Sequence, residues 1–221
     1  LPDALKAVRY IDEMEGRVRL DRGFERQRGS MKAVFDTFLQ EISSAKNRKS
    51  LDAAYQKASA ALSAVALDKP ENPLRVGIVG EYYTVMDDFG NHNVEQILGY
   101  MGRGVEIHRW MTFTHRNLEY DEQADLQTIA PYVRYSMGPT TSATLAGAIR
   151  YADAGFDGIV HVKSFGCTPE VDAMAVLQNT SADRGIPILY LSYDSQTGDA
   201  GIQTRLEAFY DMIDMKRRKQ P

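Results

Sequence analysis

The stretch FDGIVHVKSFGCTPE, residues 156–170, decides the fold, and the rest of the chain can be placed around it. Gly158 to Val162 is a short apolar run of the kind that forms a buried strand. Lys163 to Gly166 then makes a polar, glycine-containing turn. Thr168 is a suitable N-cap, and Pro169 suits the first turn of a helix, where a missing N–H costs nothing. The stretch therefore predicts a strand, a turn and a helix in direct succession.

The only cysteine of the sequence, Cys167, lies on this turn. Ligands of open α/β sheets bind where strands end and helices begin, and the positive end of a helix dipole favours a thiolate over a thiol. A small buried apolar residue is the alternative role for a cysteine. The position of Cys167 in the sequence does not favour either role over the other.

Further strand-like runs flank the central stretch at 75–80, 105–110 and 187–191. Helical patterns separate or follow them at 94–103, 169–183 and 201–216. Strands that alternate with helices predict an α/β fold with a parallel four-stranded sheet flanked by helices. The expected strand order is 2-1-3-4, which places the switch point between the strands at 75–80 and 158–162.

The segment KPENP, residues 69–73, is the clearest boundary in the chain, because its two prolines end one periodicity before another begins. Residues 1–70 are expected to form an N-terminal helical segment, and residues 71–221 an α/β domain with a helical insertion at about 111–153. Apolar residues at three- and four-residue steps predict the N-terminal helices at 4–20, 31–42 and 51–67.

Composition excludes several classes of protein. The 221 residues include 43% hydrophobic and 25% charged residues, and the net charge of −4 gives no reason to expect nucleic acid as a partner. No apolar run approaches the roughly 18 residues of a membrane-spanning helix, and no signal-peptide pattern opens the chain, so no membrane partner is expected. A single cysteine suits a reducing compartment and predicts a cytoplasmic protein. Because the sequence opens with Leu1, we expect a piece of a longer protein.

The candidate site follows from the strand ends that should meet at the switch point. Asp194 ends the last strand, and Arg205, one turn into the last helix, is expected to pair with Asp194 or Asp199 or to reach the crevice. The residues predicted to line the crevice or surround the cysteine are Glu81, Tyr82, Lys163, Ser164, Phe165, Gly166, Thr168, Asp194, Thr197, Gly198 and Arg205.

Other patterns have a structural explanation that we favour. RVGIVGEYY contains Gly77 and Gly80 but no third glycine, so a packed strand is expected rather than a pyrophosphate-binding turn. The polar loop 81–93 carries Asp, Asn and His residues that suit helix capping better than a divalent cation. His161 lies within an apolar run and is expected to be a structural histidine rather than half of a Cys/His pair.

The arginine-rich run from Arg17 to Arg28 invites a phosphate-binding hypothesis. Solvated helix charge is the favoured interpretation, because Glu13 with Arg17 and Glu15 with Arg19 have the i to i+4 spacing of helical ion pairs.

The two C-terminal motifs, HVKSFGCTPEVDA and PILYLSYDSQTGDAGIQTRLEAFYDMI, point to a family when they are taken together. They resemble the C-terminal region of 2-hydroxyacyl-CoA dehydratases and the related CoA-substrate-specific enzyme activase proteins, over about residues 74–216. The residues that carry the resemblance are Phe165, Gly166, Cys167, Pro169, Asp194, Thr197, Gly198, Gly201, Thr204, Arg205, Glu207, Ala208 and Phe209.

This resemblance implies a flavodoxin-like or Rossmann-like fold and an oxygen-sensitive iron–sulfur protein of anaerobic metabolism. In that family, cysteines from two α/β domains hold a [4Fe-4S] cluster, an ATP-hydrolysing activase supplies an electron, and water is eliminated from a 2-hydroxyacyl-CoA through a ketyl radical. By the resemblance, Cys167 would be a cluster ligand within the turn 163–168. A four-iron cluster takes four thiolates, so one cysteine implies a domain fragment with an incomplete site and no activity of its own.

The expected partners are the N-terminal cluster-binding and ATPase domains of the same or another chain, with an acyl-CoA as possible substrate. The alternative function is a non-redox flavodoxin-like module that binds a small anion or a partner, with Cys167 incidental. A thiol-dependent hydrolase is a third option, and it requires His161 or His92 beside the sulfur.

Overall fold

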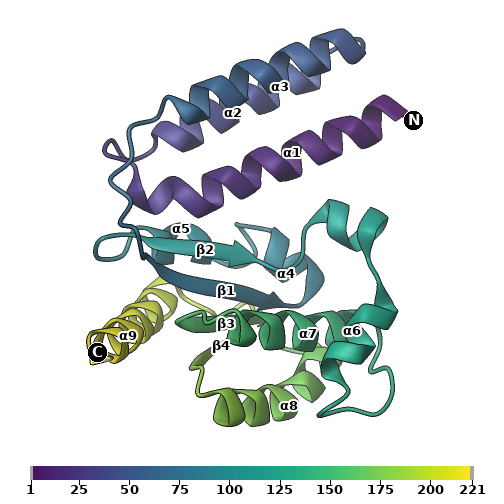
Figure 1. The fold of residues 1–221 in the computed structure, drawn as a ribbon, viewed down its shortest axis with the longest axis vertical. Coiled ribbons are helices and arrows are strands. Elements are labelled where there is room, and N and C mark those ends of the chain that lie inside the picture. Colours follow the sequence, from purple (N-terminus) through teal and green to yellow (C-terminus); the bar gives the residue numbers. More distant parts are fainter. Residues whose placement is uncertain (1, 220–221) are drawn as a thin grey trace.

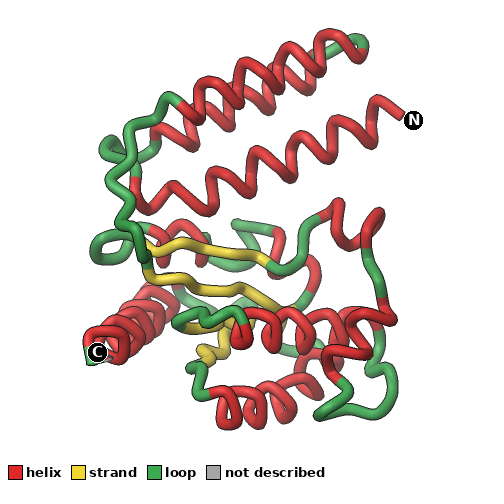
Figure 2. Tube along the Cα trace, in the orientation of Figure 1, coloured by secondary structure: helices red, strands yellow, loops and turns green. Residues whose placement is uncertain are grey.

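The computed structural model describes residues 2–219, which form a bundle of three long helices next to an α/β unit (Figures 1 and 2). The N-terminal helices are α1 (Pro2–Asp21), α2 (Ser30–Ser44) and α3 (Arg48–Ser63), with a short 3-10 helix η1 (Arg22–Phe24) after α1. The α/β unit contains β1 (Leu74–Gly80), α4 (Tyr82–Met86), α5 (Val94–Gly99), β2 (Val105–Arg109), the π-helix η2 (His115–Glu119), α6 (Glu122–Ile129), α7 (Pro139–Asp153), β3 (Gly158–Ser164), α8 (Thr168–Arg184), β4 (Ile188–Tyr193) and α9 (Asp199–Arg218).

The four strands pair in parallel in the order β2-β1-β3-β4, which confirms the predicted fold and strand order. β1 lies at the centre, with Val76 opposite Ile107 of β2 and Gly158 of β3. The chain passes from β1 to β2 on one side of β1, and from β2 it crosses to β3 on the other side. The loops that follow β1 and β3 therefore diverge between these two strands. This divergence creates the crevice in which the candidate site lies.

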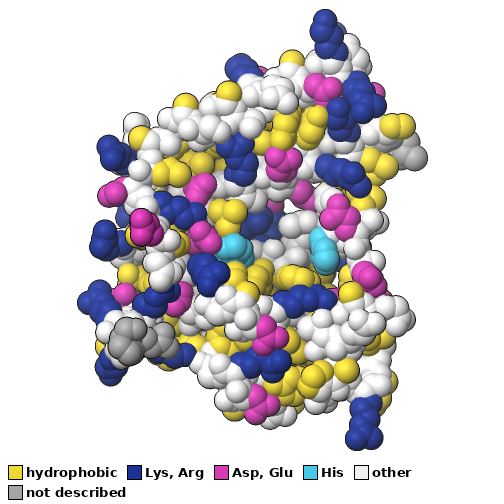
Figure 3. Space-filling model, in the orientation of Figure 1, with side chains coloured by type: hydrophobic (Ala, Val, Ile, Leu, Met, Phe, Trp, Pro, Cys, Tyr) yellow, Lys and Arg dark blue, Asp and Glu magenta, His cyan; other side chains and the backbone are white. Residues whose placement is uncertain are grey.

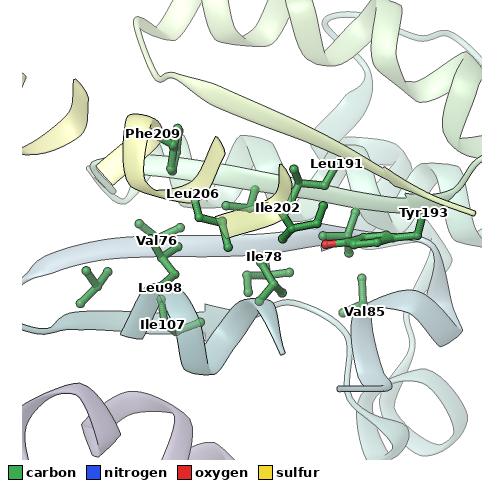
Figure 4. Packing of buried hydrophobic residues seen from close by; sticks show 14 of the residues in the cluster. Val76, Ile78, Val85, Leu98, Ile107, Leu191, Tyr193, Ile202, Leu206 and Phe209 are labelled. Atoms are coloured by element: carbon green, nitrogen blue, oxygen red, sulfur yellow. The ribbon is translucent and has the colours of Figure 1, made fainter. Parts of the chain in front are cut away.

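Helices cover both faces of the sheet. On one face, α5 and α9 enclose an apolar core that includes Ile78, Leu98 and Leu206, with Tyr193 at its edge (Figure 4). On the other face, α7 and α8 pack Leu145 and Leu177 against the sheet. Within the segment 111–153, α7 contacts β1 and β3 directly, so this helix forms part of the layer that covers the sheet.

The glycines of β1 are explained by packing. A Cβ on Gly77 would lie 2.2 Å from the Tyr151 ring, and one on Gly80 would lie 1.9 Å from the carbonyl oxygen of Val162. Gly80 also has a φ of +141°, which side chains rarely adopt. The interpretation of RVGIVG as a packed first strand is therefore confirmed, since both glycines serve close contacts with neighbouring elements.

A Gly77→Ala variant is expected to lose about 1–3 kcal/mol of stability, because the added methyl group overpacks the contact with Tyr151. Gly201→Ala is the matched control, since a Cβ there meets no atom within 4 Å. Urea unfolding followed by circular dichroism measures both. Equal midpoints for Gly77→Ala and the wild-type protein would contradict this explanation.

Several predicted boundaries move in the structure. The loop 81–93 contains the short helix α4, since Glu81 caps it. The helix expected at 94–103 ends at Gly99, and the strand expected to stop at Val162 continues to Ser164. Each change occurs at an element end, where a side-chain cap or a neighbouring strand decides the boundary.

The arginine-rich run departs from the predicted solvated face. Arg19 keeps its pair with Glu15, but it is only 4% exposed and also bonds Glu95 of α5 at 3.0 Å. Arg17 donates to the side chains of Ser59 and Ser63 on α3, so it does not form the predicted pair with Glu13. Sequence spacing could not show that α1 turns this face toward α3 and α5.

Candidate functional site

The crevice at the carboxyl ends of the strands holds a pocket of about 750 Å³. These ends of β1 and β2 point to the right in Figure 1. Four carboxylates line the pocket, and His92 is the single basic residue among its lining residues. The lining residues are Glu81, Tyr83, Thr84, Asp87, Phe89, Gly90, His92, Asn93, Ser164, Tyr193, Asp194 and Asp199.

Glu81 lies directly after β1 and caps α4. Its carboxylate accepts hydrogen bonds from the backbone N–H of Tyr83 at 3.1 Å and of Thr84 at 2.9 Å. The hydroxyl of Thr84 donates to it as well. Glu81 is therefore fixed at the crevice, with its charge dispersed over three donors. Tyr82, the next residue, lines an adjacent pocket of about 550 Å³ together with Arg116.

Asp194 follows β4 and forms a closed turn. Its carboxylate accepts from the backbone N–H of Gln196 at 2.8 Å and from the hydroxyl of Thr197 at 3.1 Å. That hydroxyl in turn accepts from the backbone N–H of Asp194 at 2.9 Å. Gly198 follows as the N-cap residue of α9. Asp194 and Thr197 thus hold the loop that forms one wall of the crevice.

His92 and Tyr193 belong to the crevice but were not among the predicted site residues. The His92 ring stacks on the Tyr193 ring with centroids 5.4 Å apart, and its Nδ1 bonds the carboxylate of Asp199. Burial raises the pKa of the Tyr193 hydroxyl. His92 and Asp199 are 107 positions apart, so only the fold could reveal this contact.

Cys167 is the N-cap residue of α8, and its side chain is half-buried. Burial raises the pKa of the Cys167 thiol, while the backbone N–H of Glu170 opposes this shift. The thiolate that the helix dipole was expected to favour is therefore not favoured in the isolated chain. Two large apolar side chains near the sulfur in sequence face solvent, namely Phe165, 68% exposed, and Val171, 49% exposed.

A buried polar network lies beneath the Cys167 turn. Glu170, in the first turn of α8, is fully buried, and its carboxylate bonds His161 Nε2 at 2.8 Å and the Thr144 hydroxyl at 3.1 Å. Thr144 also reaches the carbonyl oxygen of Gly80 at 3.2 Å. His161 is thus a structural histidine, as expected. The network joins α7, α8, β1 and β3 directly below the crevice.

The remaining predicted residues occupy different places. Lys163 is 5% exposed, and its Nζ donates to the carbonyl oxygen of Phe165 at 3.1 Å, which closes the turn before Cys167. Thr168 is the first residue of α8 and is exposed; the prediction that it is the N-cap is wrong, because Cys167 holds that position. Gly166 lies in open space. Arg205 pairs with neither Asp194 nor Asp199 but donates to the carbonyl oxygen of Tyr190 on β4 at 2.5 Å, so its predicted pairing is wrong.

The next question is whether the side chains of this chain could together bind a metal ion. Among residues 2–219, no three His, Cys, Asp or Glu side chains gather in a way that could hold a metal ion. Asn91, one candidate ligand of the loop 81–93, instead accepts from the N–H of Val94 and donates to the carbonyl oxygen of Thr84. This chain could therefore supply Cys167 as one ligand of a cluster, but the described residues fit no complete site.

A parallel sheet covered by helices on both faces, with a crevice at its switch point, places the chain among the doubly wound α/β proteins, a class in which ligands bind at the carboxyl ends of the strands. The model of one family, 2-hydroxyglutaryl-CoA dehydratase, D-component, matches residues 43–213. The chain belongs to this family. A search of curated proteins finds no match.

The next two observations concern the charge of the surface and the hydropathy of the helices. Basic and acidic side chains are interspersed over the face shown in Figure 3. No helix within residues 2–219 combines the length and the apolar character needed to cross a membrane.

Proposed function

We propose that this chain is a component of a 2-hydroxyacyl-CoA dehydratase-type enzyme, in which Cys167 supplies one ligand to an iron–sulfur cluster shared with other polypeptide. Family membership supports the dehydratase component. The observation that supports a shared cluster is the half-buried sulfur at the start of α8, flanked in sequence by the exposed side chains of Phe165 and Val171. Large exposed apolar side chains mark surfaces that another protein covers.

The residues of this chain have distinct roles in the proposal. Cys167 would bind iron, and the N–H of Glu170 would stabilise the sulfur's negative charge. The Glu170–His161 bond and the Lys163 contact fix the turn. Phe165, once covered by the partner, would exclude water. When bound, the cluster would supply a low-potential electron delivered by a partner that hydrolyses ATP. The missing ligands would come from the other cluster-binding domain, and an acyl-CoA would be the substrate.

The raised pKa of the Cys167 thiol is compatible with this proposal. A thiol that remains protonated in the isolated chain loses its proton when iron binds, because a metal ligand must be the thiolate. Cluster assembly should therefore release a proton from Cys167 and become more favourable as the pH rises. A sulfur kept neutral until the partner arrives also avoids an unpaired charge at an apolar surface.

The alternatives have less support. Four carboxylates line the crevice and would repel a small anion. Within the described residues, His161 bonds Glu170 and His92 bonds Asp199, so neither histidine activates Cys167 as a hydrolase would require. These contacts favour the cluster over a non-redox anion module or a thiol hydrolase.

Anaerobic purification of the assembled parent enzyme, with iron and sulfide analysis, tests the proposal. The wild-type enzyme should contain both elements, and a Cys167→Ser variant should lose the cluster, because a hydroxyl is a poor ligand for iron–sulfur iron. Ser164→Ala changes an exposed residue next to the same turn; it is the matched control and should retain the cluster. Wild-type enzyme without iron, or equal iron in wild-type and Cys167→Ser enzyme, would refute the assignment.

A further inference from the structure

A second pocket, distant from the crevice, is lined by cationic side chains. It has a volume of about 340 Å³, and its lining residues are Arg22, Arg28, Gly29, Lys32, Gln96 and Tyr100. None of them is a carboxylate. Arg22 belongs to η1, whose Gly23 packs against Gly99 and Val105 at the amino end of β2. The pocket therefore lies at the end of the sheet opposite Glu81 and Asp194.

The guanidinium of Arg28 is held in a defined position. It lies over the Tyr100 ring, 5.0 Å from the centroid, and Nη2 donates to the carbonyl oxygen of Tyr100 at 3.3 Å. No carboxylate among the described residues forms an ion pair with Arg28 or Arg22. The remaining N–H groups of Arg28 are therefore available to a ligand.

Most of the neighbouring carboxylates are already hydrogen-bonded or paired within the chain. Glu25 is buried and accepts from the N–H groups of Gly29 and Met31 and from the Tyr100 hydroxyl. Glu95, which lies near Arg22, is bonded to Arg19, and Asp88 is a second acidic neighbour of Arg22. Asp36 pairs with Lys32 at 2.5 Å, but both side chains are largely exposed, so this pair is weak. The lining residues themselves therefore contribute three cations and no carboxylate.

We propose that this pocket binds a phosphate or diphosphate group of a small molecule. Guanidinium groups match phosphate oxygens with paired hydrogen bonds, and Lys32 and the Gln96 amide add donors on the same pocket. The amides at the start of α2 are bonded to Glu25, so side chains rather than the helix N-terminus would recognise the ligand. The site would be independent of the cluster, and loss of either would leave the other in place.

Titration calorimetry of the full chain with sodium pyrophosphate at low salt tests this site. Saturable binding of one equivalent is expected, and Arg22→Gln and Arg28→Gln should each weaken it by about tenfold, since each removes charge-assisted hydrogen bonds. Arg26→Gln is the matched control, because Arg26 is exposed in the same segment but does not line the pocket. Circular dichroism of each variant confirms that it folds.

Further ligands separate the possible sources of the phosphate. Coenzyme A and ATP, titrated in the same way, show whether a nucleotide that carries the group binds more tightly than pyrophosphate. A hexaglutamate peptide tests an acidic protein segment instead. Absent pyrophosphate binding, equal losses in Arg26→Gln and Arg28→Gln, or tighter binding of the peptide than of pyrophosphate would each overturn the proposal.

Discussion

A Glu95→Ala variant is expected to unfold about 6–20 °C below the wild-type protein. The reason is that the variant leaves the buried guanidinium groups of Arg19 and Arg109 with Glu15 as their one shared carboxylate. Such a loss amounts to about 3–5 kcal/mol, and 1 kcal/mol corresponds to about 2–4 °C in a chain of this size. Glu95 is 3% exposed and lies 3.0 Å from Arg19 Nε and 3.4 Å from Arg109 Nη1. A thermal melt followed by circular dichroism measures the shift.

The pKa of Glu95 gives this prediction a pH dependence. Burial acts to raise that pKa, but Arg19 and Arg109 outweigh it and hold the pKa below its ordinary value. The contribution of Glu95 is thus fully present above the pKa of an unfolded glutamate and is lost as the pH falls through the folded pKa. The gap in melting temperature between wild-type and Glu95→Ala protein should narrow on acidification.

Asp36→Ala provides the control for Glu95→Ala. Asp36 also pairs with a cation, Lys32, but on the exposed surface of α2, where such a pair contributes about 1 kcal/mol at most. Its melting temperature should stay close to that of the wild-type protein. If Glu95→Ala and Asp36→Ala have the same melting temperature, the buried ion cluster of Glu95 with Arg19 and Arg109 does not hold α1 to the α/β unit.

A Glu170→Ala variant is expected to lose about 2–4 kcal/mol of stability, because the buried Nε2 of His161 would lose its partner and a cavity would open below the crevice. Thr144 would keep its bond to the carbonyl oxygen of Gly80. The first turn of α8 should also open more often, so alkylation of Cys167 by iodoacetamide should become faster. Urea unfolding measures the stability, and mass spectrometry measures the alkylation rate.

Two further variants serve as controls for the stability and the alkylation rate of Glu170→Ala. Asp172→Ala changes an exposed acidic residue of the same helix and should alter neither quantity. Glu170→Gln keeps the shape and one acceptor and should recover part of the stability. An alkylation rate unchanged by Glu170→Ala, despite lower stability, would mean that the network supports the core but does not position the cysteine.

The fold was predictable because its signals are local. Apolar runs, Thr168 with Pro169, and the prolines of 69–73 each act over a few residues, and alternation of strands and helices leaves few topologies. The crevice was predictable in part for the same reason, since Ser164 ends β3, Glu81 and Asp194 directly follow β1 and β4, and all three line one pocket.

The contacts that sequence could not supply join distant segments. The bond between His92 and Asp199, the network of Glu170, and the burial of Arg19 each depend on packing between elements far apart in the chain. Arg205 shows the same limit, because its helix directs it to a strand carbonyl instead of a carboxylate.

The N-terminal helix α1 lies outside the region that the family model matches, yet it contacts that region. The family match begins at residue 43, after α1 and within α2, yet α1 supplies Arg19 and Glu15 to the ion cluster of Glu95 and Arg109. A chain cut at residue 43 would leave Glu95 and Arg109 without these two partners. The matched region and the stable folding unit are therefore different lengths of chain.

The two edge strands of the sheet, β2 and β4, differ in how far their outer edges are covered. Helix α1 runs beside β2 (Figure 1), whereas β4 pairs, within residues 2–219, with a strand on one side only. An unpaired border can recruit a strand from a neighbouring molecule, and native proteins guard against this with charged side chains. The guanidinium of Arg205 donates to the carbonyl oxygen of Tyr190, so β4 has a positive charge beside it and one of its backbone acceptors is already engaged.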